Sequence, residues 1–213
     1  AFECPPTFGV SADMVKAFIA GGEKEENEDS YDDGLNVIKE NNITSRDVVL
    51  GLSASGSTPY VLGGLDAAKQ ASASTVAIIN NPNEAIKKLV DVQIVAQTGP
   101  EVITGSTRMK AGTAQKLILN MISTSVMIKL GNVYQNLMVD VEATNQKLVN
   151  RSIKNIMLAT NTSFEESQDA LQKAQGSAKL AILLLLLNCS VEVGKSLLDK
   201  HSGNLSLALK DQK

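Results

Sequence analysis

One short stretch of the chain has the residue types and the spacing to bind an anion. Ser53, Ser55 and Thr58 carry hydroxyl groups within six residues around Gly56. An apolar run precedes the stretch and a helical pattern follows it, so we interpret it as a loop between a buried strand and a helix. Such a loop offers side-chain hydroxyls, backbone N–H groups and a positive dipole end, and phosphate is the commonest anion to use all three. The alternative is an ordinary serine-rich turn.

A second polar group lies near the start of a long helical pattern that runs from 106 or 107 to about 131. It contains Glu101, Arg108 and Lys110. A basic residue at a helix N-terminus opposes the helix dipole, so an anion or a carboxylate is expected to compensate it. A surface salt bridge is the alternative. The helix itself is apolar on most faces, which predicts burial at the centre of the protein or against a second subunit.

Two glutamates are candidates for proton transfer. Glu3 precedes Cys4-Pro5-Pro6, and two prolines should keep this segment extended and stiff, which would fix the carboxylate. Glu28 lies in an acidic run at 23–33. The alternatives are a solvated terminal glutamate for Glu3, and a solvated face or mobile loop for the acidic run.

Periodicity predicts the elements that position these groups. Apolar runs at 14–20, 47–52, 75–80 and 91–96 predict buried strands, and helical spacing at 34–42, 59–71 and 85–90 alternates with them. This alternation implies a parallel, doubly wound sheet that binds ligands beyond the carboxyl ends of its strands. A capping box at 163–166 and helical patterns at 147–159, 177–187, 191–200 and 205–209 follow. We predict an α/β domain over 1–160 and a small all-helical appendage over 161–213.

Composition limits the partners. The chain has 213 residues, of which 43% are hydrophobic, and its formal charge of −3 attracts neither nucleic acid nor an anionic membrane. Cys4 and Cys189 lie far apart and His201 is the only histidine, which argues against the familiar zinc arrangements and a Ser-His triad. The longest apolar run, 180–187, is too short to span a bilayer. We therefore expect a cytoplasmic protein without a metal.

Three segments carry a family resemblance. The spacing Ser-x-Ser-Gly-x-Thr at 53–58 resembles the phosphate loop of sugar isomerase (SIS) domains, which bind phosphosugars and have a flavodoxin-like fold. The stretch TGPEVITGSTRMKAGTAQK at 98–116 resembles the signature of the N-acetylmuramic acid 6-phosphate etherase family of SIS-domain lyases. ECPPTFGV at 3–10 and NLMVDVEATN at 136–145 are similar to the same family. The resemblance covers nearly the whole chain.

The resemblance implies a reaction and a site. A lyase of this family removes the D-lactyl ether of N-acetylmuramic acid 6-phosphate by elimination and then hydration, in the recycling of cell-wall amino sugars, with no metal or organic cofactor. Glu28 would be the base at the sugar's C2 and Glu3 the acid for the lactyl oxygen. The residues that would bind the phosphosugar are Ser53, Ser55, Gly56, Thr58, Glu101, Ser106, Arg108 and Lys110. The family also favours a homodimer.

The chain departs from the family pattern in three places. It begins at Ala1, already inside a family motif, so we expect an N-terminally incomplete SIS domain that turns over poorly alone. The segment between Gly22 and Glu28 is shorter than usual, and Ser57 replaces an arginine, which should weaken phosphate binding. A non-catalytic phosphosugar-binding regulator or an inactive remnant is therefore the alternative to the lyase. A flavodoxin-like nucleotide binder is disfavoured, because the stretch at 99–116 has no place in it.

Overall fold

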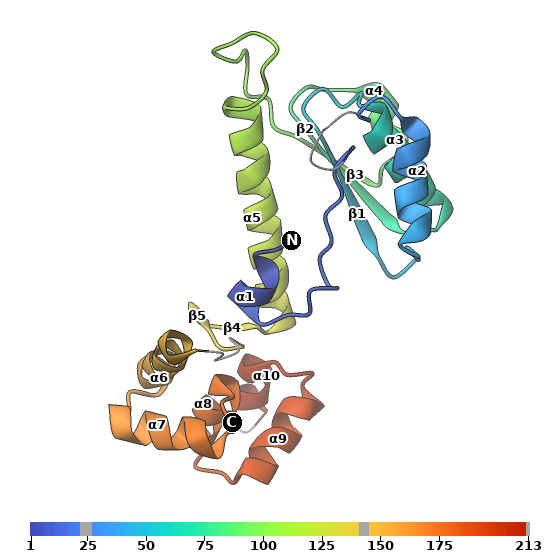
Figure 1. Cartoon of the computed structure of the whole chain (residues 1–213). Coiled ribbons are helices and arrows are strands. Elements are labelled where there is room, and N and C mark those ends of the chain that lie inside the picture. Colours follow the sequence, from blue (N-terminus) through green and yellow to red (C-terminus); the bar gives the residue numbers. More distant parts are fainter. Residues whose placement is uncertain (22–26, 141–144, 212–213) are drawn as a thin grey trace. The chain divides into compact units, whose positions relative to one another are not determined.

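The computed structural model of the protein describes residues 1–21, 27–140 and 145–211. The chain forms two compact units, which are described separately (Figure 1). One unit, the sheet unit, is Ala17–Met121. The other, the helical unit, combines Ala1–Lys16 with Ile122–Lys213. These units divide the chain at other residues than the predicted domains 1–160 and 161–213, and that domain division stays a prediction.

The sheet unit contains three parallel strands in the order β1-β2-β3. They are β1 (Val48–Ser53), β2 (Ser74–Ile79) and β3 (Val92–Val95). The register pairs Ser53 with Ile79 and Ile79 with Val95, so all three strands end at one edge of the sheet. Ala77, Ile78 and Ile79 are fully buried in the central strand. The predicted α/β class with a parallel sheet is confirmed, and each strand lies within one or two residues of its predicted range.

Three helices accompany the strands: α2 (Tyr31–Glu40), α3 (Pro59–Gln70) and α4 (Glu84–Lys87). α3 packs against β1 and β2, and α2 packs against α3 (Figure 1). Glycines permit this close approach, because a Cβ at Gly34 would lie 1.9 Å from the carbonyl oxygen of Tyr60 and a Cβ at Gly63 would lie 2.0 Å from that of Tyr31. The pair of helices therefore fixes the start of α3, where the loop 53–58 ends.

α5 (Lys110–Leu130) is the long helix of the chain, and the division between the two units falls within it. The sequence predicts its burial either inside the chain or against a second subunit. Ala111 and Met127 are buried, whereas Leu117, Met121 and Ile128 are each more than half exposed. The burial of the exposed apolar residues of α5 stays a prediction.

The helical unit begins with α1 (Cys4–Phe8) and continues after α5 with a short hairpin of β4 (Val133–Tyr134) and β5 (Leu137–Met138). Five helices follow: α6 (Gln146–Thr160), α7 (Phe164–Lys173), α8 (Ala178–Leu187), α9 (Val191–Lys200) and α10 (Leu205–Lys210). α8 contacts each of the other four (Figure 1). This central place explains why its sequence is apolar on nearly all sides.

Side-chain caps define where these helices start. Ser163 and Glu166 form the predicted capping box, in which the Ser163 hydroxyl accepts from the Glu166 N–H and the Glu166 carboxylate accepts from the Ser163 N–H. Ser177 and Ser190 cap α8 and α9 in the same way, through the N–H of the third helical residue. Because each cap satisfies an otherwise unpaired N–H, the sequence specifies these boundaries locally.

Two sequence predictions near the N-terminus are wrong. The segment after Glu3 is helical, not extended, because Pro5 and Pro6 occupy the first turn of α1, where no backbone donor is required. The strand expected at 14–20 is absent, since this segment pairs with no strand among the described residues and leaves Phe18 and Ile19 exposed. The boundary between the two units lies within it, after Lys16.

In residues 1–21, 27–140 and 145–211 no single helix has the length and hydropathy of a bilayer span. Only α7 and α8 taken together reach that length and hydropathy, and the two are bent by 113°.

Candidate functional site

The loop between β1 and α3 brings its hydroxyl groups together. The Ser53 hydroxyl lies 2.8 Å from the Thr58 hydroxyl and 3.3 Å from that of Ser55, and it accepts from the N–H of Gly56 at 3.0 Å. Ser53 is buried, whereas Ser55 is exposed. Gly56 has φ of +73°, a conformation that glycine adopts without strain. The three predicted hydroxyl residues thus form one cluster at the carboxyl end of β1.

α3 begins directly at this cluster. Thr58 is its N-cap, yet the Thr58 side chain makes no capping bond and is instead directed to Ser53. Pro59 supplies the first helical position, where its missing N–H costs little. The positive end of the helix dipole and the hydroxyl cluster therefore coincide, which favours an anion at this point.

Ser57 adds a further contact to the loop. Its N–H and its hydroxyl both donate to the Ser55 hydroxyl oxygen, at 3.2 and 2.9 Å. Ser57 is exposed. The residue that replaces the arginine of the family pattern is thus engaged within the loop.

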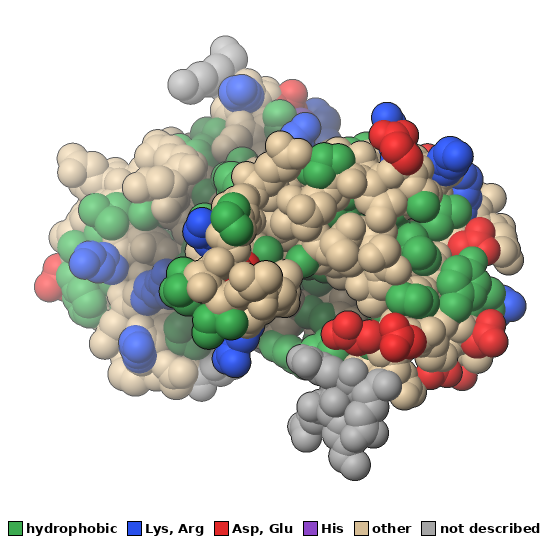
Figure 2. All heavy atoms as spheres, turned by 90° about the horizontal axis from the view of Figure 1, so that it is seen from above, with side chains coloured by type: hydrophobic (Ala, Val, Ile, Leu, Met, Phe, Trp, Pro, Cys, Tyr) green, Lys and Arg blue, Asp and Glu red, His purple; other side chains and the backbone are tan. Residues whose placement is uncertain are grey.

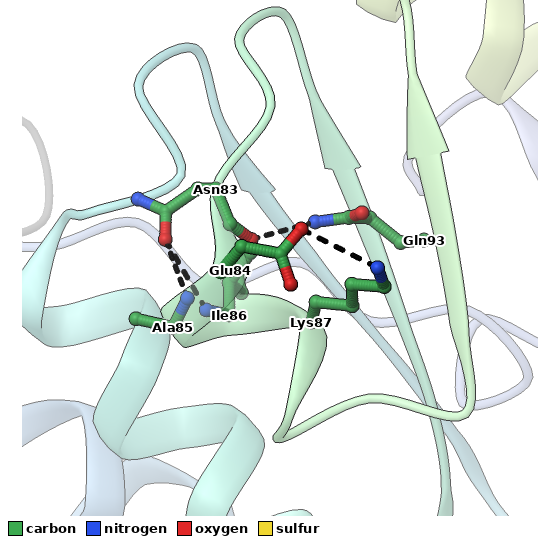
Figure 3. Close-up of polar contacts among 6 residues, drawn as sticks. All are labelled: Asn83, Glu84, Ala85, Ile86, Lys87 and Gln93. Carbon is green, nitrogen blue, oxygen red and sulfur yellow. Dashed lines mark hydrogen bonds and ion pairs between the residues drawn. The ribbon is translucent and has the colours of Figure 1, made fainter.

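A turn at 80–83 supports the loop from the end of β2. The Asn80 N–H and the Asn81 side-chain amide both donate to the carbonyl oxygen of Ala54, at 3.1 and 3.0 Å. A Cβ at Gly56 would lie 3.0 Å from the Cβ of Asn83. Asn83 in turn caps α4 through Ala85 and Ile86, and its carbonyl accepts from Gln93 (Figure 3). This turn fixes the backbone of the phosphate loop.

Asn80 also links the loop to α5. The Asn80 side chain is buried, donates to the carbonyl of Ala96 and accepts from the Gln115 side chain at 2.9 Å. Sequence reasoning treated 80–83 only as the end of a strand, and it missed Gln115. The available signal was three asparagines at the carboxyl end of a parallel strand, where such sheets place their ligand-binding groups.

Glu28 lies next to the start of α3. Its main-chain carbonyl accepts a hydrogen bond from the N–H of Tyr60 at 3.0 Å, while Ser30 caps α2 by accepting from Asp33. The Glu28 side chain is exposed and makes no hydrogen bond or ion pair with the described residues. Residues 22–26, which include Glu23, Glu25 and Glu26 of the acidic run and the shortened segment, lie outside the described residues.

Glu101 compensates the N-terminus of α5. Its carboxylate accepts from the backbone N–H groups of Lys110 and Ala111, each at 3.0 Å, and these bonds lower the pKa of Glu101 below its usual value, Ala111 contributing most. The Lys110 ammonium donates to the carbonyl of Pro100. The expected carboxylate partner for the helix N-terminus is therefore Glu101 itself, and α5 starts at Lys110 rather than at 106 or 107.

Arg108 and Ser106 stay available near this helix start. Arg108 is exposed and makes no ion pair within the described part of the chain, and Ser106 is partly buried. No hydrogen bond among the described residues joins Ser106, Arg108, Lys110 or Glu101 directly to the Ser53–Thr58 loop. Substrate binding by these four residues stays a prediction.

Glu3 belongs to the helical unit and is the N-cap residue of α1. Its carbonyl accepts from the N–H of Thr7, whereas its carboxylate is exposed and caps no backbone N–H. The structure thus brings the Glu28 main chain next to the start of α3, directly after the Ser53–Thr58 loop, but describes Glu3 in the other unit, so the pairing of the two glutamates in one site stays a prediction.

Charge does not draw anions to the sheet unit as a whole. Acidic side chains gather on the side of the molecule that carries α2 and α3 (Figure 2), and Asp32 and Asp33 lie in the first turn of α2. An anion bound at the loop would therefore depend on the local donors there. Within the described residues no group of three or more His, Cys, Asp or Glu side chains is arranged to bind a metal ion.

The parallel sheet, its flanking helices and the hydroxyl loop at the strand ends define the class of protein. Residues 34–125 match the SIS domain family. Relatives that match nearly the whole chain carry the name of one particular enzyme. The chain is 53% identical to the N-acetylmuramic acid 6-phosphate etherase of Oceanobacillus iheyensis over 209 residues, which covers 95% of this chain and 71% of the relative.

Two further relatives carry the same name. The etherase of Clostridium beijerinckii is 48% identical over 217 residues and that of Actinobacillus succinogenes is 47% identical over 215, each with 71% of its length covered. The chain therefore belongs to the N-acetylmuramic acid 6-phosphate etherase family, a family of carbon–oxygen lyases. The resemblance stated from the sequence segments is confirmed.

Proposed function

We propose that the protein cleaves the D-lactyl ether of N-acetylmuramic acid 6-phosphate to give N-acetylglucosamine 6-phosphate and D-lactate, in the recycling of cell-wall amino sugars. The observation that carries this proposal is the hydrogen bond from the Tyr60 N–H to the Glu28 carbonyl. It ties the candidate base to the first turn of the helix that follows the phosphate loop. A phosphosugar bound by its 6-phosphate would then have a carboxylate within reach of its carbon chain.

The chemistry follows from the substrate. In the open-chain sugar the C3–O bond lies β to the aldehyde, so loss of the C2 proton permits elimination. Glu28 takes that proton, the electron pair forms the C2–C3 double bond, and the C3–O bond breaks with its electrons going to the lactyl oxygen. Glu3 gives this oxygen a proton, and D-lactate leaves. Water then adds its oxygen to C3 while C2 regains a proton, so the net reaction consumes one water.

The loop residues have complementary tasks in this scheme. Ser55 and Thr58 donate their hydroxyl protons to the phosphate oxygens, and Gly56 lets the backbone approach closely because it has no side chain. Ser53, which is buried, lies within hydrogen-bond distance of both hydroxyls. Arg108, Lys110, Ser106 and Glu101 would contact the substrate from the start of α5. A homodimer and a cytoplasmic location belong to the same proposal.

A regulator that binds the phosphosugar without turnover is the second candidate. The exposed Ser57 in place of an arginine favours it, because the loop lacks a guanidinium for its ligand. The candidates differ in the use of the glutamates, since a pure binder has no need for two proton-transfer groups near one sugar.

The test is incubation of the purified chain with N-acetylmuramic acid 6-phosphate, followed by assay of D-lactate. N-acetylmuramic acid without the phosphate is the matched control. We expect lactate from the phosphorylated sugar and far less from the control, because the loop binds the phosphate. Binding in calorimetry without any lactate would support the regulator. Neither binding nor lactate would overturn both candidates.

A further inference from the structure

The turn that ends α1 packs directly on the segment after β5. Gly9, the C-cap residue of α1, has φ of +66°. A Cβ at Gly9 would lie 1.6 Å from the main-chain oxygen of Asp140. The backbones are thus in direct contact, and no residue other than glycine fits this turn without displacing one of them.

A partly buried ion pair lies on the other side of this contact. The Lys179 ammonium, in the first turn of α8, pairs with the Asp140 carboxylate at 2.5 Å, and the two side chains are 9% and 26% exposed. Displacing Asp140 would leave the buried Lys179 ammonium without its partner. Asp140 is thereby tied to α8, the central helix of the helical unit.

A second bond attaches the end of α1 to the β4–β5 hairpin. The Asn132 side-chain amide donates to the carbonyl of Phe8 at 3.1 Å, and the Asn132 carbonyl accepts from the N–H of Val139. Cys4, at the start of the helix, is buried. α1 therefore has anchors at both ends, while its N-cap residue Glu3 presents an exposed carboxylate.

We propose that Asn132, Asp140 and Lys179 are positioning residues for Glu3, acting through the Gly9 turn. This inference rests on the proposed function, in which Glu3 protonates the departing lactyl oxygen. It gives a role to Asp140, which lies in a segment that resembles the family and that the reaction scheme leaves unused. A short helix has no independent stability, so the direction of Glu3 depends on what the helix is packed against.

The test compares two rates in the same variants. Proton abstraction at C2 is followed by exchange of the sugar's C2 hydrogen with deuterium from D₂O, and protonation of the leaving group by D-lactate release. Asn132→Leu and Lys179→Met remove one anchor each, and Gly9→Ala disrupts the turn. Gly176→Ala is the matched control for Gly9→Ala, because Gly176 also has positive φ (+88°) but no atom within 4 Å of its Cβ position. Lys195→Met, at an exposed lysine of α9, is the control for Lys179→Met.

We expect lactate release to fall by ten- to a hundredfold, since a misplacement of about 1 Å can cost on the order of a hundredfold in rate. C2 exchange should stay within about threefold of the unaltered protein, as in Glu3→Gln, and the controls should change neither rate. Combined with Glu3→Gln, Asn132→Leu should cause no further loss, because both changes act on one group. If Gly9→Ala or Lys179→Met does not fold, Asn132→Leu alone still tests the inference, because it removes the bond to the Phe8 carbonyl.

The inference would be overturned if the anchor variants lost C2 exchange and lactate release to the same extent. It would also be overturned if the loss of lactate release in Asn132→Leu multiplied with the loss in Glu3→Gln. Either result would mean that the anchors only stabilise the fold. If the unaltered protein neither exchanges the C2 hydrogen nor releases lactate, the proposed function fails and the inference fails with it. An active protein whose anchor variants match their controls would overturn the inference alone.

Discussion

The main-chain carbonyl of Glu28 accepts a hydrogen bond from the N–H of Tyr60 at 3.0 Å. Tyr60 is the second residue of α3, and the loop that precedes it contains Ser53, Ser55 and Thr58. The bond therefore connects the turn before α2 with the start of the helix at the phosphate loop. Because it uses the main chain of Glu28, substitution of the side chain leaves this connection intact.

Glu28→Gln should stop exchange of the sugar's C2 hydrogen with solvent deuterium and abolish lactate release, because the amide cannot accept the proton. Thermal unfolding should be unchanged, since the backbone bond to Tyr60 persists. Asp29→Asn, in the same exposed turn, is the matched control and should keep both rates. Exchange at the normal rate in Glu28→Gln would show that another group is the base.

Removal of hydroxyls from the phosphate loop should weaken phosphosugar binding. Ser55→Ala with Thr58→Val should reduce the binding free energy by a few kcal/mol in calorimetry, because one hydrogen bond to a charged group contributes about 1.5–3 kcal/mol. Ser74→Ala, at an exposed residue that starts β2, is the control. Unaltered affinity in the double variant would place the phosphate elsewhere.

Ser57→Arg should tighten phosphosugar binding by about tenfold or more, since a guanidinium adds a charge-assisted bond to the phosphate. The exposure of Ser57 leaves room for the larger side chain. Ser57→Gln, which has an uncharged polar side chain, separates the effect of charge from that of size. Equal affinities for the arginine and glutamine variants would argue against a phosphate at this loop.

Glu101→Gln should lower stability at neutral pH, because it removes the charged acceptor for the N–H groups of Lys110 and Ala111. The pKa of Glu101 is lowered in the folded protein. Its contribution is therefore present above the unfolded pKa of about 4.3 and is lost as the pH falls through the folded value. The difference in melting temperature between the two proteins should be constant well above the unfolded pKa and should close as the pH falls through the lower, folded pKa. If the difference persisted at the lowest pH, the loss of stability would come from altered packing and not from the charge of Glu101.

The strands and helices of the sheet unit could be predicted from the sequence, because each has a local residue pattern of its own. β2 is a continuous apolar run, and Pro59 marks the first turn of α3. The hydroxyl loop was also predictable, since its residues are adjacent in sequence. Asn80 and Gln115 were not, because their bond joins residues that are 35 positions apart.

The errors have physical causes of the same kind. Pro5 and Pro6 are compatible both with an extended segment and with a first helical turn, and the packing of Gly9 on Asp140 is a tertiary contact that the local sequence does not contain. The apolar run at 14–20 satisfies the pattern of a strand, yet a strand forms only beside a partner with unpaired backbone groups.

The origin of the oxygen atoms tests the central claim, elimination followed by hydration, most directly. The protein is incubated with N-acetylmuramic acid 6-phosphate in water enriched in oxygen-18 and deuterium, and both products are analysed by mass spectrometry. The account predicts oxygen-18 at C3 and deuterium at C2 of the N-acetylglucosamine 6-phosphate, with unlabelled ether oxygen in D-lactate. Oxygen-18 in the lactate hydroxyl, with none at C3 of the sugar, would contradict it, because the ether would then have been cleaved on the lactyl side without elimination.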